Sequence, residues 1–245
     1  MRPAITSDPV AAGFDRAAQT YLANAKVQAA LARWLAQWLP EERAARALEM
    51  GAGPGVFTRF ILPWSGELTA TDASPAMCAA GKAELPEVCW RRMAAETPIG
   101  GPWDWIFSSS MLQWAADPAA VFAAWHEQLA AGGRILAGLF LSGSLGEWGA
   151  LTGKEPLQWR SVKQWRSLLK ASGFNLLRDE SERRVLTYPS AHALLRSLHS
   201  TGAAPVRHMP AGRLRRLLRD YEARHAASSG VKATWIFYRF EAAKG

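Results

Sequence analysis

The sequence predicts an α/β protein with a doubly wound, mainly parallel sheet. Short apolar segments that suit buried strands alternate with segments of helical periodicity through residues 1–141. A glycine turn, Gly51-Ala52-Gly53-Pro54-Gly55, connects the first strand to a helix. Glu49 lies at the end of that strand, and Asp72 ends the second strand 23 residues later. This interval is the length of a helix plus a strand in a βαβ unit.

The expected elements follow in chain order. Apolar residues three and four positions apart predict a helix over 14–39, which Pro40 ends. Ser74 and Asp117 are expected to be helix N-caps, because each precedes a proline that suits the first helical position. Strands are expected over 46–50, 67–71, 88–91, 103–107 and 134–141, and helices over 56–62, 75–84 and 118–130, the last closed by Gly132-Gly133.

The simple alternation stops after residue 141. Helices over 145–151 and 162–172, a long strand over 174–187 and a final strand over 234–240 are expected there. Between the last two strands lie two further helices, over 189–200 and 212–225, joined by a loop over 201–211. Because open α/β sheets bind ligands at the carboxyl ends of their strands, the insertion 188–230 is expected to form a lid. Residues 12–40 are expected to form an N-terminal helical cap on a single domain, 1–245.

Composition limits the class of protein. The chain has 245 residues, of which 49% are hydrophobic, but it lacks the run of about 18 apolar residues that a membrane span needs. Residues 1–10 lack the apolar core of a secretory signal. Two cysteines, Cys78 and Cys89, and five histidines show no disulfide framework or metal-ligand spacing. We therefore expect a cytoplasmic protein without a metal ion.

Charge is distributed unevenly along the chain. The net charge is +8, yet residues 1–141 carry 11 basic and 13 acidic residues, whereas 142–245 carry 18 and 8. The second part therefore has a net charge of +10. Such an asymmetry indicates an acidic partner, which could be nucleic acid, an anionic membrane surface or an acidic protein. The structural alternative is a set of solvated helix faces.

The acids beside the glycine turn indicate the ligand. A dinucleotide would place phosphates on this turn, where Glu49 would repel them. S-adenosylmethionine (SAM) carries an ammonium and a sulfonium and no phosphate, so a carboxylate suits it. Asp72 can accept hydrogen bonds from both ribose hydroxyls. The structural alternatives are a solvated strand-end charge at Glu49 and a helix-capping acid at Asp72.

Four stretches carry a resemblance to a known family. They are 14–21 (FDRAAQTY) followed by 25–28 (AKVQ), the glycine turn, 109–114 (SSMLQW), and the region from 142–147 (SGSLGE) to 195–203 (LRSLHSTGA). The whole chain resembles a class I SAM-dependent methyltransferase, and more narrowly the malonyl-acyl-carrier-protein O-methyltransferases of biotin synthesis. The resemblance implies a Rossmann-like sheet of seven strands. It also implies methylation of the free carboxylate of a malonyl thioester, with S-adenosylhomocysteine (SAH) as the coproduct.

The resemblance also implies the partners and the cofactor site. The partner would be a malonyl-acyl carrier protein, whose acidity fits the basic second part of the chain, and no nucleic acid or membrane is expected. Whether malonyl-CoA also serves as a substrate stays open. We expect a monomer. Relatives often carry an acid for adenine near Met93, so adenine is held here either by backbone groups and apolar packing or by Glu96. The expected cofactor-binding residues are Glu49, Gly51, Ala52, Gly53, Gly55, Asp72, Ala73, Met77, Met93, Ala94, Ser109 and Leu112.

Methyl transfer to a carboxylate is an in-line displacement that needs no general base, because the carboxylate is ionised at neutral pH. Arg196 is the first candidate for gripping that carboxylate, since an arginine offers a fork of donors. Tyr21 is the second candidate, as a hydroxyl donor. The structural alternatives are a surface charge for Arg196 and core packing for Tyr21. Residues expected to meet the substrate or the carrier protein are Gln113, Trp114, Arg213, Arg215 and Arg216.

Two other functions stay open at this point. One is a SAM-dependent methyltransferase that acts on another small carboxylic acid or on a metabolite carbon. The other is a basic binding protein, such as a scaffold or an RNA-binding module, that keeps the fold without turnover. The complete set of Glu49, the turn glycines and Asp72 argues against a site that has lost its activity.

Overall fold

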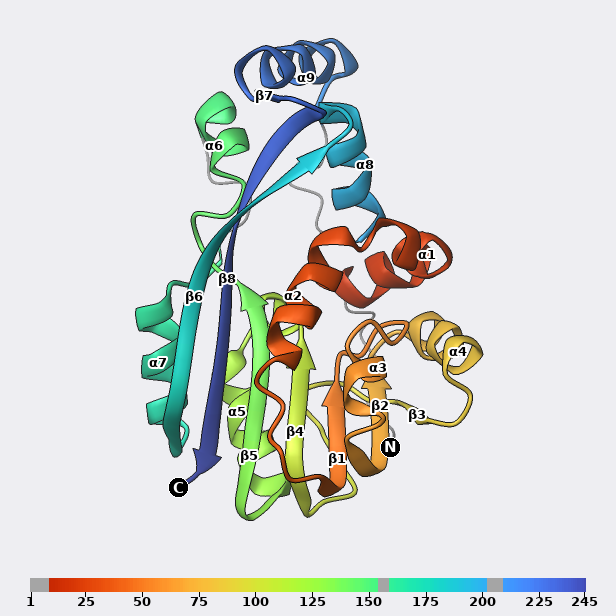
Figure 1. Cartoon of the computed structure of the whole chain (residues 1–245), viewed down its shortest axis with the longest axis vertical. Coiled ribbons are helices and arrows are strands. Elements are labelled where there is room, and N and C mark those ends of the chain that lie inside the picture. Colours follow the sequence, from red (N-terminus) through yellow and green to blue (C-terminus); the bar gives the residue numbers. More distant parts are fainter. Residues whose placement is uncertain (1–8, 154–158, 202–208) are drawn as a thin grey trace, which may run out of the picture.

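The computed structural model describes residues 9–153, 159–201 and 209–245 and forms one twisted sheet with helices around it (Figure 1). The strand order is β3-β2-β1-β4-β5-β8-β6, in which β8 is antiparallel to both neighbours and the other pairs are parallel. This path holds seven strands, and β7 adds a short eighth that pairs with β8. The strands are β1 (Ala44–Met50), β2 (Ser65–Asp72), β3 (Cys89–Arg92), β4 (Trp103–Ser109), β5 (Leu129–Phe140), β6 (Phe174–Tyr188), β7 (Ala226–Ala227) and β8 (Gly230–Lys244).

The helices largely follow the sequence expectation. Ser74 accepts from the Met77 N–H at 3.0 Å, and Asp117 caps its helix by accepting from two N–H groups at 3.1 Å each. The helices are α1 (Pro9–Asn24), α2 (Lys26–Ala36), α3 (Thr58–Ile61), α4 (Pro75–Glu84), α5 (Pro118–Gln128), α6 (Gly146–Thr152), α7 (Val162–Ala171), α8 (Ala191–Ser200) and α9 (Ala211–Arg224), with a 3₁₀ turn η1 (Leu112–Trp114).

Two local predictions were wrong. The helix expected over 14–39 is two helices, separated at Ala25, whose ψ of 38° departs from helical geometry. Gly132-Gly133 does not close a helix but lies within β5, which already begins at Leu129. Gly133 is needed there because a Cβ would lie 3.0 Å from the carbonyl oxygens of Ala130 and Trp103. The second miss comes from a tertiary contact, the close approach of the Trp103 backbone of β4, that overrides the local glycine signal.

Strands β6 and β8 form a long antiparallel arm that extends beyond the parallel part of the sheet (Figure 1). As predicted, two helices, α8 and α9, lie between these strands in the chain. Figure 1 shows α6, α8 and α9 around the far end of the arm, with α1 beside α8. Most of the loop expected over 201–211 lies outside the described residues.

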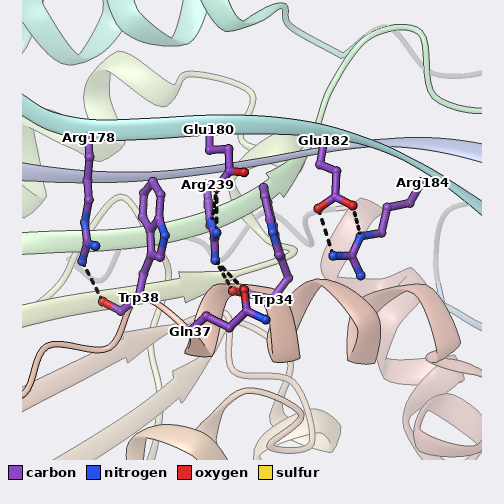
Figure 2. A network of polar contacts seen from close by, with 8 residues as sticks. All are labelled: Trp34, Gln37, Trp38, Arg178, Glu180, Glu182, Arg184 and Arg239. Atoms are coloured by element: carbon purple, nitrogen blue, oxygen red, sulfur yellow. Dashed lines mark hydrogen bonds and ion pairs between the residues drawn. The ribbon is translucent and has the colours of Figure 1, made fainter.

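A buried arginine on β8 fixes the end of α2 (Figure 2). The Arg239 guanidinium lies between two indole rings, 4.1 Å from the centroid of Trp34 and 4.2 Å from that of Trp38. It donates to the Trp34 carbonyl and, at 3.4 Å, to Gln37 Oε1, and it pairs with Glu180 at 2.6 Å. A cation at the carboxyl end of a helix is favoured by the helix dipole. Helix α2 is therefore tied to the β6–β8 arm.

Replacing Arg239 by leucine is expected to lower the free energy of unfolding by about 2 to 4 kcal/mol. The change removes two cation–π contacts, one of the two donors to the Trp34 carbonyl and the partner of Glu180. Urea unfolding measures the loss. The matched control is Arg166→Leu, since Arg166 makes a bidentate pair with Asp179 at 2.7 and 3.0 Å but is exposed. Ion pairs made by exposed side chains contribute about 0 to 1 kcal/mol. Similar losses of unfolding free energy in the two variants would therefore contradict a special role for the contacts of Arg239 with Trp34, Trp38 and Glu180, which we call the Arg239 clamp.

Candidate active site

One cavity lies at the carboxyl ends of β1, β2 and β4 and is roofed by α1 and α2. Its walls hold acids, small residues and aromatic rings, and none of the described lining residues is a lysine or an arginine. The lining residues are Phe14, Tyr21, Gln28, Glu49, Gly51, Ala52, Gly53, Val56, Phe57, Asp72, Ala73, Met77, Met93, Ala95, Glu96, Ser109, Ser110, Met111, Trp114 and Ala115. The site is therefore suited to a cationic ligand with an apolar part.

The glycine turn forms the floor of this cavity. Gly51, Gly53 and Gly55 have φ values of +70°, +55° and +92°, in the left-handed region that favours glycine. A Cβ on Gly51 would lie 2.3 Å from Cγ of Met111, so only glycine fits against that side chain. Gly55 does not line the cavity; a Cβ there would lie 3.0 Å from Leu85 of α4. Gly51 and Gly53 therefore line the cavity, whereas Gly55 allows the turn to pack against α4.

Glu49 is buried beneath the turn, with only 1% of its surface exposed. One carboxylate oxygen, Oε2, accepts a hydrogen bond from the Thr58 hydroxyl at 2.6 Å, whereas Oε1 is buried without a partner. Burial raises the pKa of Glu49 to about 8, and the nearby charge of Asp72 adds to this rise. A buried carboxylate with a vacant acceptor that faces a cavity is the group that a bound ammonium would satisfy.

Asp72 bridges the turn and the start of α4. Its Oδ2 accepts from the Gly53 N–H at 2.9 Å and its Oδ1 from the Ser74 N–H at 2.8 Å. Burial raises the pKa of this carboxyl, and the charge of Asp15 on α1 raises it further. Asp15 in turn accepts from the Ser74 hydroxyl. The carboxylate is held rigidly against the cavity, and each oxygen keeps a lone pair for a hydroxyl donor.

The roof of the cavity comes from the N-terminal helices. Tyr21 lines the cavity from α1 and is 8% exposed, and burial raises the pKa of its hydroxyl well above the ordinary value. Phe14 packs edge-on against Trp114 of η1, with centroids 6.2 Å apart. Trp114 also meets Trp159 at 5.6 Å. These aromatic contacts close one side of the cavity to water.

The inserted helices do not contribute to the described walls. No residue of α8 or α9 lines the cavity, whereas α1 and α2, which fall in the cap expected over 12–40, do. A lid formed by the insertion stays a prediction. Arg196 lies exposed on α8, where Nη2 is 3.3 Å from His192 Nδ1. The α9 arginines Arg213, Arg215 and Arg216 are also exposed, because the apolar side of α9 packs inward. A substrate role for these four arginines stays a prediction.

Most of the residues expected at the cofactor line the cavity, and three do not. These are Leu112, the first residue of η1, which is fully buried in the core; Ala94, which lies half-buried; and Gly55, which packs against α4. Gln113, expected at the substrate, instead donates from Nε2 to the Ser110 carbonyl at 2.7 Å. The side chain of Glu96 lies at the exposed rim, and Met93 lines the wall as expected, so the adenine alternatives stay open.

Sequence reasoning missed several lining residues. Gln28, Ser110 and Met111 lie in segments that carry the resemblance but received no role. Ser110 has a φ of +62°, which is rare for a residue other than glycine. The available signal for Gln28 was a polar residue on the apolar face of a helix. Phe14, Val56, Phe57, Ala95 and Ala115 complete the set that was missed.

The described residues hold neither a metal-binding cluster nor a membrane-spanning helix. Across 9–153, 159–201 and 209–245, no three histidine, cysteine, aspartate or glutamate side chains gather so that they could hold a metal ion. No helix within those ranges is long and apolar enough to cross a membrane.

Comparisons with known proteins agree with this geometry. Residues 48–135 match a family described as a methyltransferase domain. A malonyl-[acyl-carrier protein] O-methyltransferase of Alcanivorax borkumensis is 32% identical over 250 residues, which cover 94% of this chain and 84% of that protein. The biotin biosynthesis bifunctional protein BioCD of Bordetella avium is 30% identical over 238 residues, or 91% of this chain and 50% of that protein.

A solved structure supports the fold. The protein BH2331 of Bacillus halodurans C-125, which carries a methyltransferase assignment, superposes with a TM-score of 0.65 at 12% identity. The match covers 87% of this chain and 98% of that one, and at this identity it shows the fold alone. Together with the relatives above, it establishes the Rossmann-like class I methyltransferase fold. The chain belongs to the malonyl-[acyl-carrier protein] O-methyltransferase family.

Proposed function

We propose that this chain transfers the methyl group of SAM to the free carboxylate of a malonyl thioester on an acyl carrier protein. The product would be the malonyl methyl ester that primes pimeloyl synthesis for biotin. The observation that carries the proposal is the unpartnered, buried Oε1 of Glu49 beside a cavity without lining cations. A cofactor with an ammonium and a sulfonium supplies the missing charge. The names of the relatives supply the substrate and the pathway.

SAM, when bound, supplies a methyl group on a positively charged sulfur. The residues of the chain provide position and exclusion of water, since an ionised carboxylate needs no general base. The carboxylate of Glu49 would hold the cationic end, and that of Asp72 the ribose hydroxyls. Phe14 and Trp114 keep water from the malonyl carboxylate, which is a better nucleophile when its hydration is removed.

Tyr21 is the stronger candidate for orienting the malonyl carboxylate. Its hydroxyl lines the cavity, and the raised pKa keeps it protonated, so it can donate a hydrogen bond to an anion. Arg196 would have to approach by a movement of α8 against α1. These helices meet through the Ser197 hydroxyl, which donates to the Asn24 carbonyl at 2.9 Å.

The acidic carrier protein is proposed to dock on α9. Arg213, Arg215 and Arg216 are exposed there, next to the end of the β6–β8 arm (Figure 1). Charges at the rim of an interface mainly steer association and respond to salt. Helix α9 packs on α8, which in turn packs on α1 of the roof, so a carrier protein bound to α9 would extend its malonyl arm toward the cavity along this side of the molecule.

Transfer of labelled methyl from SAM tests the proposal directly. We expect label in malonyl-acyl carrier protein and none in the acetyl form, which lacks the free carboxylate. Substituting Arg213, Arg215 and Arg216 by alanine should raise KM for the carrier-protein substrate about tenfold, as for three rim charges of about 0.5 kcal/mol each. The KM for malonyl-CoA should not change, and added salt should act in the same selective way.

Other outcomes of that assay favour the competing functions. Label in free malonate but not in thioesters would support a methyltransferase for a small acid. Label in RNA would support the nucleic-acid function. Binding of SAH without transfer to any of these acceptors would overturn the proposed reaction while leaving the cofactor site intact.

A further inference from the structure

Gln28 is a buried polar residue for which the proposed reaction has so far no use. It is the third residue of α2, only 6% exposed, and it lines the cavity together with Glu49 and Tyr21. Its Oε1 is buried without a hydrogen-bond partner. A buried amide oxygen without a partner destabilises the fold unless a ligand satisfies it. The side chain is therefore placed for a bound group.

The cofactor brings a group that the charged lining residues cannot satisfy. Its amino-acid end carries an ammonium and a carboxylate, and Glu49 matches only the ammonium. The carboxylate would face Glu49, Asp72 and Glu96 with no lysine or arginine among the described lining residues, so a neutral donor must meet it. The lining also holds side-chain hydroxyls, and that of Ser110 is likewise buried without a partner. The amide of Gln28 differs from a hydroxyl because its donor and its acceptor lie on separate atoms.

We propose that Gln28 binds the amino-acid end of the cofactor. Its amide N–H donates to the α-carboxylate, and its Oε1 accepts from the α-ammonium that Glu49 also holds. The inference rests on the proposed use of SAM, and it adds a specificity: the site distinguishes SAM and SAH from nucleosides that lack this end. A glutamine can serve both charges because its amide offers a donor and an acceptor side by side.

The Arg239 clamp on α2 fixes the position of the Gln28 amide. Arg239 holds the carboxyl end of the helix that presents Gln28 (Figure 2). The break at Ala25 separates α2 from α1, which packs on α4 and α8 instead. Gln28 is thus presented from a fixed helix, and a preorganised donor loses less free energy on binding than a mobile one.

Calorimetry with two ligands tests the proposal. SAH carries the amino-acid end, whereas 5′-methylthioadenosine keeps the nucleoside and the sulfur but lacks it. Gln28→Met keeps the shape and removes the hydrogen bonds, so Kd for SAH should rise about 10- to 100-fold, as for one or two charge-assisted bonds. Kd for methylthioadenosine should stay within about twofold of the wild-type value. Gln28→Glu should weaken SAH further, because it adds a carboxylate beside the ligand's own.

The control is Arg33→Met, an exposed residue of the same helix that does not line the cavity, which should leave both ligands unchanged. Equal losses for the two ligands in Gln28→Met would show a structural role and overturn the proposal, as would unchanged affinity for SAH. The test is separate from the reaction itself. Wild-type protein that binds SAH but methylates no malonyl thioester would overturn the proposed function and leave this assignment standing.

Discussion

Replacing Glu49 by glutamine is expected to lower SAH affinity at least about 100-fold while making the ligand-free protein more stable at pH 8. The variant removes the buried charge that a bound ammonium would pair with. Without ligand the ionised Glu49 carboxylate destabilises the fold, since its Oε1 has no partner and burial raises its pKa to about 8. Calorimetry with SAH and thermal unfolding without ligand measure the two effects.

The pH dependence of stability has a defined sign. Because the pKa of Glu49 is about 8 in the fold against an ordinary value of 4.5, the folded chain holds a proton that the unfolded chain has released between those two values. Ligand-free stability should therefore contain a component that falls as pH rises through this interval. This component should disappear in Glu49→Gln. The prediction is contradicted if the difference in unfolding free energy between wild type and Glu49→Gln does not change with pH, or changes in the opposite direction.

The ligand should reverse this effect. An ammonium pairs with the ionised carboxylate, so SAH binding near pH 7 should release a proton, and affinity should increase from about pH 6 to pH 8. Calorimetry in two buffers that differ in ionisation enthalpy counts the proton. In Glu49→Gln any residual binding should release none.

The second large effect is expected from Gly51→Ala. The added Cβ would lie 2.3 Å from Cγ and 2.5 Å from Cβ of Met111, and a rotation of the Met111 side chain cannot move its own Cβ away. The left-handed φ of +70° costs about 1 to 2 kcal/mol, and the overpacking costs about 1 to 3 kcal/mol more. Urea unfolding should show the combined loss, with SAH binding reduced because the floor of the cavity shifts.

Gly53→Ala provides the matched control. Gly53 also has a positive φ, +55°, but a Cβ there would meet nothing within 4 Å. Only the backbone cost of about 1 to 2 kcal/mol is expected. Equal losses at the two positions would mean that Met111 moves freely and that close packing against Gly51 is unimportant.

Local signals made much of the cofactor half predictable. The glycine turn, the acids at the ends of β1 and β2 and the capped start of α4 are encoded within a few residues of each position, because backbone conformation and capping act locally. The alternation of strands and helices predicted the fold class, and the resemblance of four sequence stretches predicted the family. The observed bounds of the elements differ from the predicted ones where a tertiary contact decides the conformation, as at Gly133, which packs closely against the Trp103 carbonyl.

The roof of the site was predictable only in part. The sequence assigned residues 12–40 to an N-terminal cap, and residues of α1 and α2 line the described cavity. The lid expected from the insertion 188–230 stays a prediction, since no residue of α8 or α9 lines that cavity. Gln28 and Met111 enter it through packing between segments that are far apart in the chain. The Arg239 guanidinium lies between the rings of Trp34 and Trp38 although it is some 200 residues away in the sequence, so no local pattern near the two tryptophans predicts this contact.

The sequence by itself determined the kind of ligand, because the charges of Glu49 and Asp72 and the bare backbone between them are properties of the residues and their spacing. Only the tertiary structure decided which side chains of the N-terminal helices line the cavity, Gln28 among them. Those outcomes depend on how α2 is anchored to a distant strand, and such long-range packing follows from the sum of many weak contacts that no short stretch of sequence contains.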